Sequence, residues 1–303
     1  MLFEIGCKAC ATALAIVLVA KLGERAGALL ASVAMTFPMN AGPGFFFMAL
    51  EHSAAFVRQG ALVGFAGTGA VLAFVASFVA VARRHGFARG LVCGLLAWLA
   101  LALVTVLLPR SLLSAALLIA LGSGLAVLLR TGRVAALPRT AVRAGWQLVL
   151  LRGLIAGLVV AGVAAAAGAI GPTLAGLAYA FPTTMLAALW VLERHYGPEF
   201  TLATMARVPA GIATYAGFCL ALHLAAGPLP PLAAWGLAVA AAVAIALLRA
   251  ALGQPRPPAP GGAPPRRAPW TRKAGTTTAG APAKRRRLCR RRGAPYMIAR
   301  SRS

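Results

Sequence analysis

Two apolar stretches of the chain are interrupted by the same dipeptide. Residues 27–50 read GALLASVAMTFPMNAGPGFFFMAL, and residues 172–192 read PTLAGLAYAFPTTMLAALWVL. Each stretch is long enough to cross a bilayer as a helix, which takes about 20 apolar residues. Each also places a Phe-Pro pair near its middle, where proline removes a backbone donor and clashes with the preceding turn. The sequence therefore predicts two membrane helices broken at corresponding points.

The composition indicates that the chain belongs in a membrane. Of its 303 residues, 60% are hydrophobic and only 12% are charged, against about 25% charged residues in soluble domains. The net charge of +25 does not predict a specific nucleic-acid partner, because 14 of the 30 Lys and Arg residues follow residue 253. The first residues lack the basic region and cleavage site of a signal peptide, so we expect them to begin the first span.

Apolar runs of about 17 to 25 residues mark the expected spans. They predict an all-α fold, a polytopic membrane helix bundle that uses the lipid bilayer as its solvent. The nine runs cover residues 4–20, 27–50, 60–82, 91–108, 112–129, 147–168, 172–192, 208–226 and 232–250.

The connecting segments predict the orientation of this bundle, because cytoplasmic loops are rich in Lys and Arg. With nine spans, ten of these residues fall on one side and only Arg58 and Arg110 on the other. We therefore expect a multi-pass protein of the inner membrane, with its N-terminus outside and its C-terminus in the cytoplasm. The ten are Lys21, Arg25, Arg83, Arg84, Arg89, Arg130, Arg133, Arg139, Arg143 and Arg194.

The chain changes character at about residue 252, where Pro, Gly and Arg become abundant. Such a segment cannot bury enough apolar surface to offset its ordering entropy, so we expect disorder. Its basic residues could contact anionic lipid headgroups. The segment could also be a plain cytoplasmic tail, which simply follows the positive-inside rule, or an out-of-frame extension. The expected organisation is a first membrane repeat plus linker helix at 1–129, a basic cytoplasmic loop at 130–146, a second repeat at 147–251 and the tail at 252–303.

A shift of 144 residues superimposes the two Phe-Pro pairs and their surroundings. With a two-residue gap, the shift also superimposes two Leu-Glu pairs. This match is informative because the chain has only five acidic residues. This pattern indicates an internal duplication of a four-helix unit. The aligned positions are Gly27 with Gly171, Leu30 with Leu174, Phe37 with Phe181, Pro38 with Pro182, and Leu50-Glu51 with Leu192-Glu193.

Four spans on each side of a single linker span make the second copy inverted relative to the first. Secondary transporters use such inverted repeats, with interrupted helices meeting near the membrane midplane. Carbonyl groups freed at each break need a partner other than lipid. We therefore predict one substrate site at the repeat interface, lined by Phe37, Pro38, Asn40, Phe181, Pro182, Thr183, Thr184 and Tyr215.

Each feature of this site also has a structural interpretation. A proline can be a packing kink, and threonine hydroxyls within helices can bond the preceding carbonyls. Glu51 and Glu193 close the two interrupted stretches. A glutamate at a helix end can simply reach the aqueous interface, and coupling of solute movement to protons is the functional alternative.

The motif LAYAFPTT at 177–184 is followed about 30 residues later by GIATYAGF at 211–218. This pattern resembles the GlpM family of small bacterial membrane proteins, whose members have about half of the spans expected here. The resemblance implies a duplicated and fused form of a polytopic inner-membrane protein. It implies no settled activity.

Signatures of enzymes are missing from the sequence. It has no nucleotide-binding loop, HExxH or GxSxG motif, and its five scattered cysteines predict neither disulfides nor a metal site. We expect no enzyme, metal or cofactor. The prediction is a transporter-like or permease-like protein that moves a small or lipid-like solute. A non-transporting scaffold or assembly subunit is the main alternative, and a membrane enzyme acting on lipid is a third.

Overall fold

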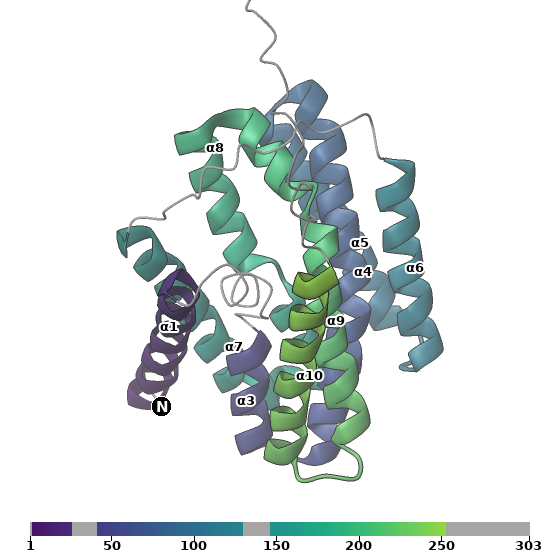
Figure 1. The fold of residues 1–303 in the computed structure, drawn as a ribbon. Coiled ribbons are helices and arrows are strands. Elements are labelled where there is room, and N and C mark those ends of the chain that lie inside the picture. The colour runs from purple at the N-terminus through teal and green to yellow at the C-terminus, as the bar shows by residue number, and fades with distance from the viewer. Residues whose placement is uncertain (1, 26–40, 130–145, 253–303) are drawn as a thin grey trace, which may run out of the picture. The chain divides into compact units, whose positions relative to one another are not determined.

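The computed structural model describes residues 2–25, 41–129 and 146–252, which lie in the first of two compact units, residues 1–255. The expected disordered tail falls outside the described residues. The described ranges consist of helices and connecting turns, without a strand, so the all-α prediction is confirmed for them (Figure 1). The helices are α1 (Leu2–Arg25), α3 (Ala41–Glu51), α4 (Ala54–His85), α5 (Phe87–Leu107), α6 (Leu112–Leu128), α7 (Trp146–Ala180), α8 (Thr183–Met205), α9 (Val208–Ala225) and α10 (Pro231–Leu252).

Helix α4 is the most enclosed of these helices and packs against α3, α5, α6, α7, α8 and α9. Its 32 residues contain no proline and many Ala and Gly, so the helix continues unbroken and its neighbours approach closely. The Ser53 hydroxyl caps its start by accepting a hydrogen bond of 3.4 Å from the Phe56 amide. Gly86 ends it with a φ of 85°, which suits glycine because it has no Cβ.

Two glycines bring α6 against α4. Gly69 of α4 lies against the Leu118 carbonyl, and Gly122 of α6 lies against the Gly69 carbonyl. A Cβ at either glycine would overlap these backbone atoms, so the close approach depends on small residues, as is common between membrane helices. Only this narrow face of α6 is covered, since Leu113, Leu117 and Leu121 remain more than half exposed.

The stretch from α7 to α9 is segmented, in contrast to α4. Two kinks place a glycine of positive φ directly before a proline, with φ values of 77° at Gly171 and 79° at Gly197. Because proline cannot continue the hydrogen-bond ladder of the preceding turn, it suits the first turn of a new helix. The four prolines that begin segments here are Pro172, Pro182, Pro198 and Pro209.

The predicted interruption at Phe181 and Pro182 is confirmed. The Phe181 amide bonds to the Ala178 carbonyl at 3.2 Å, and the Thr183 amide bonds to the Phe181 carbonyl at 2.8 Å. Both bonds span fewer residues than the i to i−4 bonds of an α-helix. Residues 172–180 therefore form a short helical segment between a kink and a break. The matching pair, Phe37 and Pro38, lies outside the described residues.

Four described helices are long and apolar enough to cross a membrane: Ala54–His85, Phe87–Leu107, Gly153–Ala180 and Pro231–Arg249. Three other predicted spans form shorter apolar helices, Ile5–Ala15, Leu112–Leu128 and Gly211–Ala225. The span at 27–50 is described only from α3 onward, and the span at 172–192 is divided by the break. The structure is compatible with an integral membrane protein, but it does not confirm nine spans.

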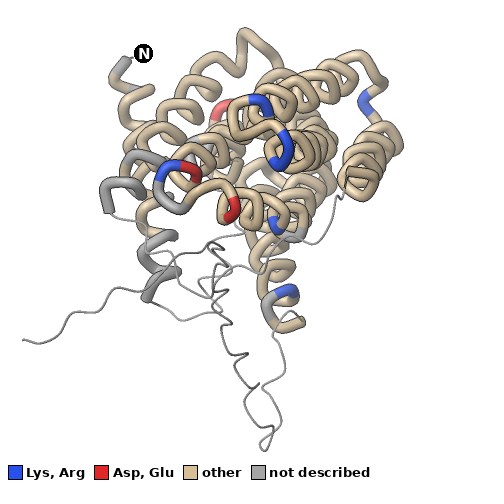
Figure 2. Tube along the Cα trace, turned by 90° about the horizontal axis from the view of Figure 1, so that it is seen from above, with Lys and Arg blue, Asp and Glu red and all other residues tan. Residues whose placement is uncertain are grey.

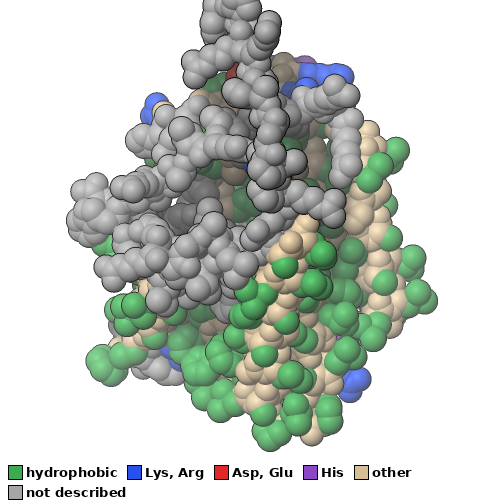
Figure 3. Space-filling view, in the orientation of Figure 1, with side chains coloured by type: hydrophobic (Ala, Val, Ile, Leu, Met, Phe, Trp, Pro, Cys, Tyr) green, Lys and Arg blue, Asp and Glu red, His purple; other side chains and the backbone are tan. Residues whose placement is uncertain are grey.

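The outward faces of the helices are apolar. Figure 3 shows hydrophobic side chains over α10 and α6 in that view, with Lys and Arg mainly toward its upper and lower ends. Soluble monomers rarely expose apolar patches beyond a few hundred Å², and this surface is compatible with contact with lipid. Its exposed members include Val92, Leu96, Leu99 and Leu103 on α5 and Leu232, Leu237 and Leu248 on α10.

Helices α1 and α7 pack closely through two glycines of α7. A Cβ on Gly157 would lie 2.5 Å from the Ala9 carbonyl oxygen, and one on Gly153 would lie 3.3 Å from that of Ala13. Residue numbers thus rise along α1 as they fall along α7. The two helices are antiparallel, and they join the N-terminal and C-terminal parts of the chain.

A second antiparallel pair, α4 and α9, also joins the two parts. His223 Nδ1 donates to the Arg58 carbonyl at 2.9 Å, and Gly64 lies against Cys219. Each of these helices also packs against the helix that follows it, α4 against α5 and α9 against α10. The region where α4 crosses α9 holds the polar residues described next.

Candidate functional site

Polar and aromatic side chains meet on α4 at Gly64. A Cβ on Gly64 would lie 3.2 Å from the Tyr215 hydroxyl oxygen, 3.2 Å from Cys219 Sγ and 3.3 Å from Phe45 Cζ. The missing side chain therefore lets groups from α9 and α3 reach the backbone of α4. Tyr215, a residue predicted for the site, has its hydroxyl buried at this interface.

Tyr179 reaches the same region from the short segment before the break. Its ring centroid is 5.3 Å from that of Phe45, and its edge lies against Gly44, where a Cβ would be 2.5 Å from Cε1. Phe218 of α9 packs on Phe45 at 5.9 Å. Aromatic contacts thus connect α3, α7 and α9 around Phe45.

Two threonines add buried hydroxyls to this region. Thr68 lies one turn after Gly64, on the same face of α4, and Thr214 lies one turn before Phe218 on α9. Because α4 and α9 are antiparallel with Gly64 opposite Cys219, Thr68 is level with Tyr215. Thr68 and Thr214 are 1% and 0% exposed.

We call Thr68, Tyr179, Thr214 and Tyr215 the hydroxyl cluster. The hydroxyls of Thr68, Tyr179 and Thr214 have no hydrogen-bond partner among the described residues. The Tyr215 hydroxyl interacts with the Cys219 thiol of the same helix, which is a weak hydrogen-bonding group. Buried hydroxyls are nearly always bonded, and leaving one unbonded costs about 1–3 kcal/mol. The cluster therefore offers unused hydrogen-bonding capacity in the protein interior.

The helix break lies beside this cluster, but Phe181 turns to another neighbour. A Cβ on Gly67, next to Thr68, would be 2.6 Å from the Cβ of Ala180. The Phe181 ring packs edge-on against Trp98 of α5 at 4.8 Å. The structure thus brings the broken helix end to the hydroxyl cluster, whereas Phe181 serves a packing contact.

Some of the remaining residues predicted for the substrate site lie within the described part of the structure, and others do not. Pro182 is buried and Thr183 is half-buried where α8 begins. The Thr184 backbone is helical, and its side chain is outside the description. Phe37, Pro38 and Asn40 also lie outside the described residues, so the meeting of the two breaks remains a prediction.

Glu51 forms an ion pair that the sequence did not predict. Its Oε1 contacts Nζ of Lys8 on α1, which stands 5.9 Å from the centre of the Phe47 ring. Lys8 is 8% exposed and the Glu51 side chain 32%. Charged residues between membrane helices are costly and usually paired, and Figure 2 shows how few described positions carry a charge. The second carboxylate, Glu193, is half-buried on α8, which packs against α7 and α4.

Contacts at one end of α4 connect loops that were predicted to share a side of the membrane. Arg110 Nε and Gln59 Nε2 both donate to Thr173 Oγ1, at 3.1 and 3.4 Å. With the bond between His223 and Arg58, they gather the start of α4, the α5–α6 turn, the kink of α7 and the end of α9.

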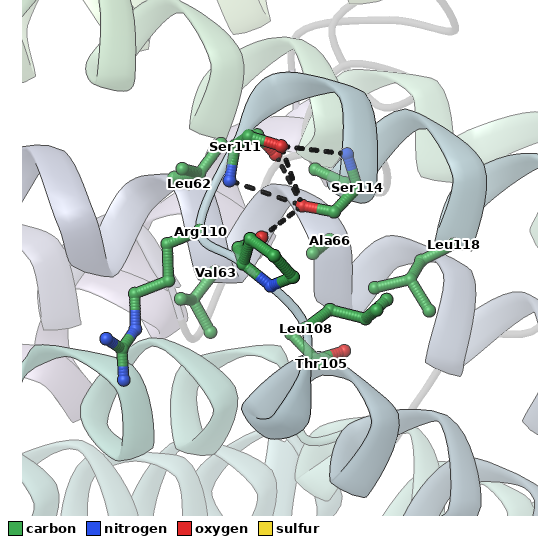
Figure 4. A pocket seen from close by; sticks show the side chains of 11 residues that line it. Leu62, Val63, Ala66, Thr105, Leu108, Arg110, Ser111, Ser114 and Leu118 are labelled. Atoms are coloured by element: carbon green, nitrogen blue, oxygen red, sulfur yellow. Dashed lines mark hydrogen bonds between the residues drawn. The ribbon is translucent and has the colours of Figure 1, made fainter.

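A small pocket lies beside the α5–α6 turn (Figure 4). The Ser111 and Ser114 side chains cap α6 by accepting from each other's amides at 3.2 Å, and the Ser114 hydroxyl donates to the Pro109 carbonyl. Arg110 points away from these serines in Figure 4. The cavity volume of about 10 Å³ is at the lower limit for one water molecule, so the pocket serves the turn rather than a solute.

Sequence reasoning missed Tyr179 and Lys8 as members of sites. Tyr179 stands two residues before Phe181 within the quoted motif, and a tyrosine so near a break was the available signal. Lys8 lies in the expected first span, and nothing in its spacing indicated Glu51 as its partner. Comparison of the chain with protein-family models, curated proteins and solved structures finds no match.

Proposed function

We propose that this protein is a transporter-like or permease-like protein of the inner membrane, with its solute site at the interface of two inverted repeats. The observation that carries the proposal is the hydroxyl cluster: four buried hydroxyls next to a helix break, where α4 packs antiparallel to α9. Three of the four have no hydrogen-bond partner among the described residues. Interrupted helices at a repeat interface commonly form transporter sites. No metal, cofactor or enzymatic step is part of the proposal.

The packing of the helices supports the inverted repeat. Antiparallel pairs are what a two-fold axis in the membrane plane requires of equivalent helices, and both α1 with α7 and α4 with α9 are antiparallel. Gly157 contacts Ala9, and Gly153 contacts Ala13. The midpoint of these contacts is therefore Ala11 on α1 and Ile155 on α7. These two positions differ by 144, the same shift that superimposes the Phe-Pro pairs.

The proposal includes nine passes, with the N-terminus outside and the C-terminus in the cytoplasm. The gathering of Arg58, Arg110 and His223 at one end of α4 supports the assignment of their loops to one side. Kinship with the GlpM family and contact of the basic tail with anionic headgroups belong to the same proposal. They rest on the sequence patterns alone.

Solute flux into proteoliposomes tests the function. Osmotic swelling with a panel of uncharged, anionic and cationic solutes should reveal at least one that enters faster than in empty liposomes. Replacing Pro182 by Ala should restore a continuous helix and abolish this flux, while the protein still inserts. Pro198→Ala is the matched control, since it changes a proline at another kink of α8.

The variant Pro38→Ala extends the test to the first repeat. If both breaks build one site, its effect and that of Pro182→Ala should be strongly non-additive. Wild-type liposomes that admit no solute, or a silent Pro182→Ala variant, would contradict the proposal and favour a scaffold or assembly subunit.

A further inference from the structure

Resting on the proposed function, we infer that the hydroxyl cluster binds an uncharged solute that has both hydrogen-bonding groups and an apolar face. The inference concerns the class of ligand. It follows from three properties of the region around Phe45: the absence of an unbalanced charge among the described residues, the surplus of hydroxyls and the aromatic side chains.

The cluster itself has no charged side chain, and the charge that acts on it among the described residues is balanced. The Glu51 carboxylate on α3 is close enough to act electrostatically on Tyr179, but it is paired with Lys8. An ionic solute would have to leave water without a counter-charge, which is strongly unfavourable in a membrane interior.

The hydroxyls provide both kinds of hydrogen-bonding group. Each can donate one bond and accept two, and their three source segments, α4, α9 and residues 172–180, approach from different directions. A carbonyl, amide or hydroxyl group of a solute would satisfy them. The rings of Phe45 and Phe218 and the thiol of Cys219 present an apolar surface beside them.

Movement of residues 172–180 gives a route to this closely packed region. The segment carries Tyr179 and lies between the Gly171 kink and the Pro182 break, and transitions of this kind concentrate backbone change at the ends of elements. Gly176, in the same segment, lies against the Gly60 carbonyl of α4. Displacement of the segment from α4 would expose Thr68 and Tyr215 together.

Thermal unfolding of the purified full chain in detergent tests the ligand class with three probes of similar shape. Butyramide is uncharged, butyrate is an anion and butylammonium is a cation. At the same high millimolar concentration, butyramide should raise the unfolding temperature by ~2 °C or more, because a ligand stabilises the state that it binds. The two ions should not.

Four variants locate the effect: Thr68→Val, Tyr179→Phe, Thr214→Val and Tyr215→Phe. Each removes a hydroxyl with little change of shape. Without probe, the three variants that remove an unpartnered hydroxyl should be as stable as the wild type or more so, and Tyr215→Phe should lose only the weak bond to Cys219. Each should also weaken or lose the shift caused by butyramide. Thr12→Val is the matched control, since Thr12 on α1 is buried and unpartnered but lies outside the cluster, and it should keep the full shift.

Three outcomes would overturn the inference: no shift with butyramide, equal shifts with all three probes, or a full shift in all four cluster variants. Flux measurements separate this failure from failure of the proposed function. Ion-selective flux in liposomes would leave transport standing and remove the ligand class. A complete lack of flux, with the butyramide shift intact, would remove transport and leave a binding site.

Discussion

Helix α4 and the stretch from residue 172 to 225 face each other across the hydroxyl cluster, but they are built differently. α4 runs unbroken from Ala54 to His85 and is held by neighbours around most of its surface. The opposing stretch has a segment start at each of its four prolines. A continuous helix resists local change, whereas kinks and breaks are the positions where backbone angles change most readily.

This difference shows how the candidate site is divided. Thr68 and Gly64 belong to the continuous helix, and Tyr179, Thr214 and Tyr215 belong to the segmented stretch. One wall of the site is therefore fixed, and the other consists of short pieces that can shift relative to it. Five substitutions follow. Two change α4 and two change the segmented stretch, whereas Lys8→Met changes a contact between α1 and α3 and gives a reference outside both.

The largest loss of stability is expected from Gly69→Val on α4. The new Cβ would overlap the Leu118 carbonyl, so α6 would have to separate from α4, at a cost of about 3 kcal/mol. Unfolding in a denaturing detergent series would measure the loss. Gly124→Ala on α6 is the control, because nothing lies within 4 Å of its Cβ position. If the Gly69→Val protein is as stable as the wild type, the close packing of α6 on α4 does not hold α4 in place.

A smaller loss of stability is expected from Lys8→Met, which removes the ion-pair partner of Glu51. We expect about 2 kcal/mol, less than for a fully buried pair, because the Glu51 side chain is 32% exposed. A double-mutant cycle with Glu51→Gln would measure the coupling between α1 and α3. Equal losses from Lys8→Met in the wild-type and Glu51→Gln backgrounds would mean that the pair contributes nothing.

Alanine at the two kinks tests the segmented side. Gly171→Ala and Gly197→Ala place a Cβ at φ values of 77° and 79°, which costs about 1 kcal/mol each. The same denaturation series would detect it, and Gly162→Ala serves as reference, since that position in α7 is helical and open. Kinks that are mere packing features should give additive losses and unchanged flux.

The smallest loss of stability is expected from a change at the start of α4. Ser53→Ala removes the hydroxyl that caps the helix, at a cost of about 0.5–1 kcal/mol. α8 begins at Pro182 without a side-chain cap, so its first amides provide the comparison within the same variant. Hydrogen exchange at the first amides of both helices would show whether Ser53→Ala loosens only α4.

The sequence was sufficient where one local rule decides the structure. Proline at 182 predicted the break, and apolar runs predicted the positions of α4, α5 and α10 to within several residues. The kink at Gly197 was missed because its Gly-Pro pair follows a run of charged and polar residues that read as a loop.

Long-range contacts could not be predicted in the same way. The pairing of Lys8 with Glu51 and the contact of Gly64 with Tyr215 depend on the register between helices far apart in the chain. Small residues set that register through close approach. Gly64 and Gly67 could be recognised as small, but the sequence does not state which neighbour each one admits.

The length of α4 has a consequence for the membrane around it. A helix of 32 residues is about 48 Å long at 1.5 Å per residue, whereas the hydrocarbon layer is about 30 Å thick. The stretch from Gly60 to Ala82 is free of charged residues and matches that layer with a modest tilt. In a bilayer, this match would place Arg58 in one headgroup layer and Arg83 in the other. A thinner or thicker bilayer would change the tilt of α4. The crossing angle between α4, which carries Thr68, and the segmented helices would change with it.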